Sequence, residues 1–117
     1  MDVAVQTLDT NAVVTISGEA DARGLKLLEE ELSNLSRSGA KHVILDLRDL
    51  SYIASPGVAF LVRFHDHFEE LGGCMALANL PPRIQGIFQV TKLASRFLIF
   101  GSVKEAQAHF VSEGGKS

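Results

Sequence analysis

Residues 42–68, HVILDLRDLSYIASPGVAFLVRFHDHF, constrain the fold more than any other stretch of the chain. Residues 43–47 form a short apolar run with β-branched side chains, a pattern typical of a strand that is buried on both faces. The apolar residues that follow recur at spacings of three and four, which predicts one buried helical stripe of Phe60, Leu61, Phe64, Phe68 and Leu71. The stretch therefore predicts a buried strand, a short connection and a helix.

The connection between this strand and this helix reads Ala54-Ser55-Pro56-Gly57. Ser55 is a favourable N-cap because its hydroxyl oxygen can accept a hydrogen bond from an unpaired amide of the first helical turn. Pro56 then takes the first helical position, where its missing N–H is not needed and its fixed φ suits the helix. The unpaired amides and the positive dipole end make such a helix start a favourable site for interactions. We therefore expect the functional site of the chain here.

The rest of the chain alternates between strand patterns and helix patterns. Further strands are predicted at residues 3–8, 13–16, 74–78 and 97–100. Three further helices are predicted from one-sided apolar faces, formed by Leu25, Leu28, Leu32 and Leu35, then by Ile84, Ile87 and Phe88, and last by Val103, Ala106 and Phe110. Asp21 is expected to cap the first of these helices, and Ser102 with Glu105 forms a capping box before the last.

The resulting order is β-β-α-β-α-β-α-β-α, which predicts an α/β fold with a small, mixed and mostly parallel five-stranded sheet. The opening hairpin supplies the antiparallel pair. Ligands of such sheets collect at the carboxyl ends of the strands, beside the N-termini of helices. The segments Gly18–Ala22 and Ser51–Gly57 are expected to be loops at that end.

The composition fits one domain over residues 1–117, with an ordered core over about residues 3–111. The chain is 46% hydrophobic and 21% charged, and its net charge of −3 without a basic cluster argues against nucleic acid as the partner. Cys74 alone cannot form an intramolecular disulfide, which fits a reducing compartment. No apolar run is long enough to span a bilayer, and the first ten residues lack the pattern of a secretory signal, so a cytoplasmic protein is expected.

No constellation of side chains in the sequence calls for catalysis, a metal or a cofactor. His65 and His67 are two residues apart, so they point in different directions on a helix. Asp46 lies within a strand pattern, and no paired acidic residues end the first strand to complete a magnesium site with Asp46 and Asp49. Cys74 enters an apolar strand and is interpreted as a small buried residue rather than a nucleophile. The chain is predicted not to be an enzyme.

Two segments at the predicted strand ends resemble the STAS domain family: Gly18-Glu19-Ala20-Asp21 after the second strand, and residues 49–58, DLSYIASPGV, after the third. The resemblance extends over about residues 3–110 and implies the same small sheet with helices. It also implies what free-standing family members do. Such antagonists bind an anti-sigma factor that is also a protein kinase, and phosphorylation of a Ser or Thr before the central helix breaks the complex.

The phosphorylation motif of the family differs in this chain. The family places the acceptor immediately before a glycine that corresponds to Gly57, and this chain has Pro56 there, which cannot be phosphorylated. The family's preceding aspartate corresponds to Ala54. Ser55, one residue earlier than the usual acceptor, carries the hydroxyl of this motif. Ser55 is either a displaced phosphoacceptor or a plain helix cap, and the cap is the simpler interpretation.

The leading hypothesis is a non-catalytic interaction switch that docks an anti-sigma factor or a related serine kinase. The predicted partner-binding residues are Asp21, Arg23, Ser51, Tyr52, Ala54, Ser55, Pro56, Gly57 and Val58. Four of them, Tyr52, Ala54, Pro56 and Val58, are expected to be exposed, with Tyr52 as an apolar anchor. Asp21 is interpreted as a cap that can also take part in recognition.

Other functions stay open at this point. STAS-like domains also form the tails of sulfate transporters and small regulatory subunits of lipid transporters, where they hold an ATPase, and the loss of the usual acceptor makes a transporter subunit more credible. A third hypothesis is a small α/β protein that binds a nucleotide or an anion at the same helix start, although no constellation supports turnover there. The sequence also leaves homodimer formation open.

Overall fold

The structure, a computed structural model, describes residues 1–8, 10–53, 55–92 and 95–114. These residues form the predicted order of elements, namely β1 (Asp2–Leu8), β2 (Asn11–Ala20), α1 (Ala22–Arg37), β3 (His42–Ile53), α2 (Ser55–Glu70), β4 (Cys74–Ala78), α3 (Pro82–Val90), β5 (Leu98–Phe100) and α4 (Val103–Gly114). The predicted α/β class is therefore confirmed.

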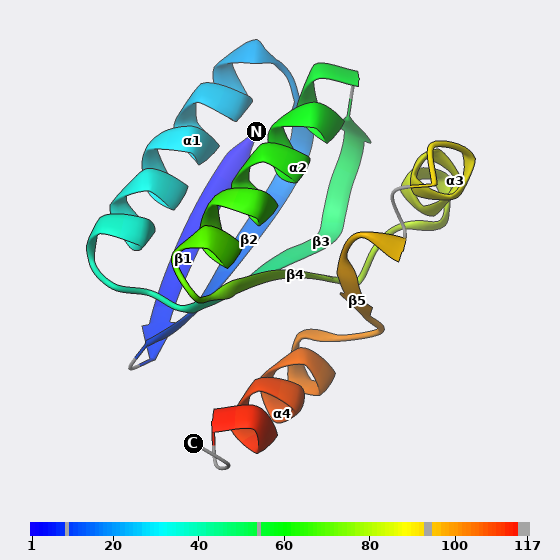
Figure 1. Ribbon diagram of the computed structural model, residues 1–117. Coiled ribbons are helices and arrows are strands. Elements are labelled where there is room, and N and C mark those ends of the chain that lie inside the picture. Colours follow the sequence, from blue (N-terminus) through cyan, green and yellow to red (C-terminus); the bar gives the residue numbers. More distant parts are fainter. Residues whose placement is uncertain (9, 54, 93–94, 115–117) are drawn as a thin grey trace.

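The strands form one sheet in the order β1-β2-β3-β4-β5, which is also their order in the chain (Figure 1). β1 and β2 are antiparallel, and every other pair of neighbours is parallel. A parallel step needs a crossover connection, and α1, α2 and α3 lie in the three crossovers. The mixed, mostly parallel five-stranded sheet that the sequence predicts is confirmed.

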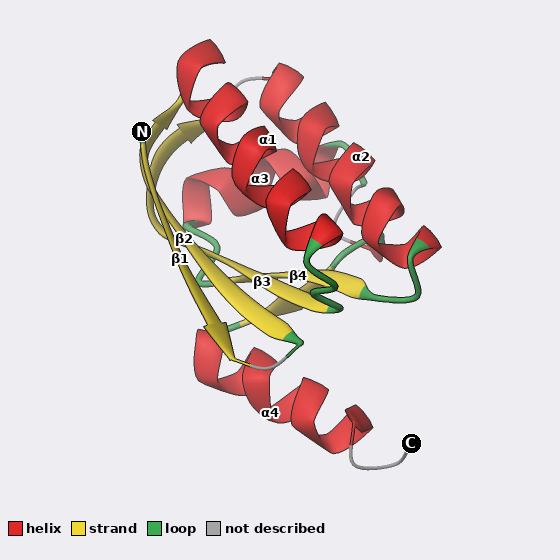
Figure 2. Cartoon of the chain, turned by 90° about the vertical axis from the view of Figure 1, so that its left-hand side faces the viewer, coloured by secondary structure: helices red, strands yellow, loops and turns green. Residues whose placement is uncertain are grey.

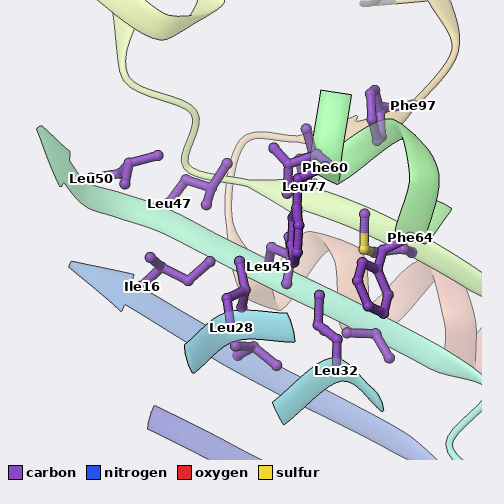
Figure 3. Close-up of a cluster of buried hydrophobic side chains, with 14 of the residues drawn as sticks. Ile16, Leu28, Leu32, Leu45, Leu47, Leu50, Phe60, Phe64, Leu77 and Phe97 are labelled. Carbon is purple, nitrogen blue, oxygen red and sulfur yellow. The ribbon is translucent and has the colours of Figure 1, made fainter. Parts of the chain in front are cut away.

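The helices cover the two faces of the sheet unequally. α1, α2 and α3 lie on one side, and α4 lies on the other (Figure 2). The larger core fills the space between the sheet and the first group, and Figure 3 shows Leu28, Leu45 and Phe60 within it. A smaller cluster under α4 contains Ile44, Ala76, Ala78, Ala106 and Phe110. Because Leu45 belongs to one cluster and Ile44 to the other, β3 is buried on both faces, as predicted.

The predicted helical stripe of α2 is confirmed in four of its five positions. Phe60, Leu61, Phe64 and Phe68 are all buried in the larger core. Leu71 is 52% exposed, so its predicted burial is wrong. The reason is that α2 ends at Glu70 and the chain turns at Gly72, whose φ of +83° is one that glycine adopts without strain.

The predicted capping box before α4 is confirmed in a slightly shifted form. The Ser102 hydroxyl accepts a hydrogen bond from the Glu105 backbone N–H at 3.1 Å. The Glu105 carboxylate accepts a hydrogen bond from the backbone N–H of Gly101, one residue before the cap, at 3.0 Å. Both interactions satisfy amides that the helix itself leaves unpaired, so they fix where α4 begins.

In the two segments expected to be loops, residues 18–20 and 51–53 are strand and residues 55–57 are already helix, and this is the main correction to the predicted fold. β2 continues to Ala20 and β3 continues to Ile53, and these two residues pair with each other. β3 contains two more residues than β2 over this stretch because the register shifts twice, between Thr15 and Ser17 and between Gly18 and Glu19. Such bulges allow residues typical of turns to remain in a paired strand.

Candidate docking site at the starts of two helices

The extended strands bring the starts of α1 and α2 side by side. Ala20 and Ile53 are register partners, and Asp21 alone then separates β2 from α1, just as Ala54 alone separates β3 from α2. Ala54 lies outside the described residues. Two helix starts are thus positioned at the carboxyl ends of neighbouring parallel strands, where ligands of such sheets collect.

Asp21 caps α1 as the sequence predicts. Its backbone is extended, and its Oδ1 accepts a hydrogen bond from the backbone N–H of Gly24 at 2.8 Å. The Gly24 backbone lies close to Met1, because a Cβ at position 24 would come within 2.6 Å of the Met1 Cβ. The cap is exposed, so the second carboxylate oxygen of Asp21 can also face a partner.

The start of α2 is positioned by close packing at Gly57, which has no side chain. A Cβ at Gly57 would lie 2.6 Å from Ile53 Cγ1 and 3.6 Å from Leu25 Cδ2. Glycine therefore allows α2 to begin directly against the end of β3 and against α1. The helix begins at Ser55, one residue before the predicted start at Pro56. The Ser55 side chain lies outside the described part of the structure, so its capping role stays a prediction.

Exposure divides the predicted partner-binding residues into two groups. Arg23, Ser51 and Pro56 are exposed, as is Asp21, and Tyr52 is 53% exposed. Gly57 is buried and Val58 is only 7% exposed, so the predicted exposure of Val58 is wrong. The reason is that the first turn of α2 sits against the core, which leaves Gly57 and Val58 to position the surface rather than to form it.

Tyr52 lies on a different side of the sheet from the two helix starts. Its neighbour Ile53 belongs to the core beneath α1 and α2, and successive residues of a strand point to opposite faces. Tyr52 therefore faces the α4 side of the sheet, beside Glu19, which is its register partner. The end of the sheet separates Tyr52 from Arg23 and Pro56, so a partner must reach around that end to contact all three.

The structure adds a cleft that sequence analysis did not find. It has a volume of about 420 Å³ and lies between the end of β3 and the first turn of α3, with a lining of Leu50, Ser51, Pro81, Pro82, Arg83 and Ile84. Ser51 links this cleft to the predicted site. Among the side chains that the structure describes, neither Arg83 nor Arg23 forms an ion pair. No sequence signal could reveal the cleft, because its two walls are about thirty residues apart in the chain.

The carboxylate of Asp46 is part of the sheet rather than of a metal site. Its Oδ1 accepts hydrogen bonds from Asn79 Nδ2 at 3.0 Å and from the Arg48 backbone N–H at 3.2 Å. These contacts tie β3 to the end of β4, where Asn79 has a φ of +56°. Within the described residues, no group of three or more His, Cys, Asp or Glu side chains could hold a metal ion.

An electrostatic cluster of His65, Asp66, Glu69 and Arg96 lies away from this site, around the second half of α2. His65 is 4% exposed, and its Nδ1 lies 3.1 Å from Asp66 Oδ1 while its Nε2 lies 3.3 Å from Glu69 Oε1. Arg96 donates a hydrogen bond to Asp66 Oδ2 at 2.6 Å. His65 and Arg96 together hold the pKa of Asp66 below its ordinary value of 3.8, because both hydrogen-bond its charged form.

One finding bears on the membrane. Over the residues that the structure describes, none of the helices combines the length and the apolar character needed to cross a bilayer.

Known proteins similar to this chain include anti-sigma factor antagonists. The chain is 32% identical over 93 residues to the anti-sigma-B factor antagonist of Bacillus subtilis, a match that covers 80% of this chain and 84% of the relative. It is 26% identical over 110 residues to BtrV of Bordetella bronchiseptica, described as a candidate anti-sigma factor antagonist, with coverage of 94% and 95%. These names favour the antagonist interpretation over a transporter subunit.

Solved structures support the fold. The unphosphorylated anti-sigma factor antagonist SpoIIAA matches with a TM-score of 0.83 and 20% identity over 95% of this chain and 97% of that one. The phosphorylated form of SpoIIAA from Bacillus matches with a TM-score of 0.76 and 21% identity over 93% and 99%. The family model of the STAS domain matches residues 2–106. This chain therefore belongs to the STAS domain family.

Proposed function

We propose that this chain is an anti-sigma factor antagonist, a non-catalytic cytoplasmic protein that binds an anti-sigma factor with serine kinase activity. The observation that carries the proposal is the 32% identity to the anti-sigma-B factor antagonist of Bacillus subtilis over most of both chains. The relatives are named as regulators rather than enzymes. The exposed end of the sheet, where two helices begin beside each other, gives such a protein a surface on which to dock.

The docking surface that we propose has a polar centre and an apolar rim. Asp21, Arg23 and Ser51 supply polar groups, and the exposed Pro56 supplies an apolar group at the start of α2. Tyr52 is the exposed aromatic side chain at the rim, the kind of residue that often anchors an interface. Arg83 extends the surface across the cleft, where it can pair with a carboxylate of the partner. Gly57 and Val58 support this surface from beneath.

We also propose that phosphorylation of Ser55 controls this docking. Ser55 begins a helix of sixteen residues, and a phosphate there is stabilised by the helix N-terminus. The modification adds about −2 charges at the centre of the surface and so opposes the approach of a partner that fits the neutral form. Pro56 occupies the usual acceptor position of the family, so Ser55 is the remaining hydroxyl of the motif. Homodimer formation, which the sequence leaves open, is a question separate from this switch.

The docking surface can be tested by calorimetric titration against purified anti-sigma factors with kinase domains from the same genome. We expect Ala54→Arg and Arg23→Glu each to weaken binding about tenfold or more, because they block or reverse the centre of the surface. Arg37→Glu is the matched control, since Arg37 is exposed at the opposite end of the same helix. Binding of Ala54→Arg with unchanged affinity would show that this surface is not the interface.

The phosphorylation can be tested on protein purified from its own host. Tryptic mapping of residues 49–63 by mass spectrometry should find a phosphate on Ser55, and Ser55→Ala should abolish it. Ser55→Glu should weaken binding to the kinase partner while Ser55→Ala leaves it intact. A peptide that remains unmodified under all growth conditions would contradict the switch and leave a constitutive binding protein. Co-purification with a transporter ATPase instead of an anti-sigma factor would contradict the antagonist function.

A further inference from the structure

β1 is an edge strand with all seven of its residues paired on one side. Asp2 to Leu8 pair with Ser17 to Asn11 of β2 without a single register shift. No strand of the described chain lies on the outer side of β1 (Figure 1). A long, regular edge presents backbone N–H and C=O groups to any further strand that can approach.

The edge of β1 lacks the features that usually prevent such pairing. Its sequence, DVAVQTL, contains no proline and no lysine, and its charged residue, Asp2, stands at one end. Monomeric proteins commonly interrupt exposed edges with charges, proline or bulges. The opposite edge of the sheet is protected by its length, since β5 spans only Leu98–Phe100. The two edges are therefore not equivalent.

Apolar side chains also lie exposed along the β1 edge. Val5 is 36% exposed and pairs with buried Val14, so it points to the face of the sheet covered by α1. α1 lies over the start of β1, as the approach of Gly24 to Met1 shows. Leu27, one helical turn after Gly24, is on the same flank and is 40% exposed. Val5 and Leu27 thus form an exposed apolar strip beside the outer edge of β1.

We propose that two copies of this chain join through their β1 strands, antiparallel and centred on Val5, into one continuous sheet. A two-fold axis makes such a contact self-limiting, and the full length of β1 is used. Val5 then faces Val5 of the second copy, Val3 faces Thr7 and Asp2 faces Leu8, so no like charges are opposed. Pairing of β1 with β5 of another copy would leave most of β1 unpaired and would continue into an open chain.

This dimer is independent of the proposed docking function. The proposed docking surface lies at the carboxyl ends of β2 and β3, whereas the dimer uses the outer edge of β1, and β2 separates β1 from β3. Each copy therefore keeps its docking surface, and the dimer presents two of them. Failure of partner binding leaves the dimer testable, and a monomeric chain leaves the docking proposal unaffected.

The proposal can be tested by placing charged side chains at Val5, which lies on the two-fold axis. We expect the unmodified chain to sediment as a dimer, and Val5→Glu and Val5→Lys each to weaken the dimer about tenfold or more, since like charges then face each other. Equal amounts of the two variants should restore a mixed dimer. Val90→Glu is the control, because Val90 is 85% exposed at the end of α3. A monomer at millimolar concentration, or a dimer unaffected by both Val5 variants, would overturn the proposal.

Hydrogen exchange of the unmodified protein gives a second measurement that needs no variant. Outward-facing amides of residues 2–8 should exchange more slowly as the protein concentration rises, because pairing protects them. The amides of β5, at the other edge, should show no such dependence. Exchange in β1 that is independent of concentration while the protein is dimeric would place the interface elsewhere and overturn the proposal.

Discussion

The two strand-to-helix junctions at the candidate site lie side by side, yet different interactions position them. At the junction of β2 and α1, the Asp21 carboxylate accepts a hydrogen bond from the Gly24 amide. At the junction of β3 and α2, the absence of a side chain at Gly57 lets the helix approach Ile53 and Leu25 directly. A polar cap thus contributes to the first start, and a close steric fit in the protein interior contributes to the second.

This difference has a consequence for function. The Asp21 carboxylate is committed to the start of α1 through its hydrogen bond with the Gly24 amide. Gly57 helps to position the start of α2 by packing and carries no polar side chain. A phosphate on Ser55, the first residue of α2, would meet the N-terminal amides and the positive dipole end of that helix.

The largest effect on the free energy of unfolding is expected from a substitution at Gly57. We expect Gly57→Ala to destabilise the fold by about 1–3 kcal/mol, because the added methyl group overlaps the buried Ile53 side chain and must push α2 outward. The free energy of unfolding from urea denaturation measures this. Gly86→Ala is the matched control within α3, where a Cβ meets open space, and it should stabilise by about 0.5–1 kcal/mol. Equal changes in the free energy of unfolding for Gly57→Ala and Gly86→Ala would show that close packing at Gly57 does not help to position α2.

A smaller effect is expected at Asp21. Asp21→Ala should lower the free energy of unfolding by about 1 kcal/mol, because it removes the acceptor for the Gly24 amide. Asp21→Asn retains a side-chain oxygen and should cost only a fraction of that. If both variants lost the same stability, the charge of Asp21 rather than its hydrogen bond would hold the junction, and the dipole of α1 would become the explanation.

These two junctions also mark what the sequence can reveal. Asp21 and the pair Ser102–Glu105 were predictable caps because a polar residue before an apolar helical stripe has a local physical reason. The contact between Gly57 and Ile53 was not predictable, since Gly57 belongs to a motif that resembles a turn. The same limit explains the strand ends. Glycine and acidic residues near positions 18–21 indicate a loop, yet parallel pairing with β3 supplies hydrogen bonds that override local preference.

The candidate site was predicted in position but not in shape. The sequence placed it at the ends of β2 and β3, and the structure brings Asp21, Arg23 and Pro56 to that end. The sequence could not show which face of the sheet each side chain of β3 lies on. The reason is that the two register shifts in β3 change the alternation of side chains that a period of two predicts. Tyr52 consequently points to the far side of the sheet. Val58 is buried for a different reason, because the first turn of α2 sits against the core. Arg83 enters the site through the tertiary fold alone.

In the far half of α2, polar contacts add to the packing of Phe64 and Phe68 in the larger core. Asp66 links His65 of the same helix to Arg96, thirty residues further along the chain. His65 also packs its ring edge against Phe97, with ring centroids 4.9 Å apart. The segment before β5 is thus joined to α2 by an ion pair at the surface and an aromatic contact beneath it.

The smallest expected effect follows from this link and depends on pH. His65 and Arg96 hold the pKa of Asp66 below 3.8, so the charged form of Asp66 stabilises the folded state. Its contribution is present above the unfolded pKa and is lost as the pH falls through the lower folded value. Asp66→Asn should therefore be slightly less stable than the unmodified chain near neutral pH, and this difference should vanish in strong acid.

Urea denaturation of both proteins at several pH values measures the difference, with Gly57→Ala as the contrasting variant. The Gly57 effect arises from packing and should not change between neutral and acidic pH. The Asp66 effect should also shrink at high salt, because the Asp66 and Arg96 side chains are both partly exposed and their attraction is screened. A loss of stability that depends on pH for Gly57→Ala, or one that is independent of pH for Asp66→Asn, would contradict the assignment of the Gly57 effect to packing and of the Asp66 effect to charge.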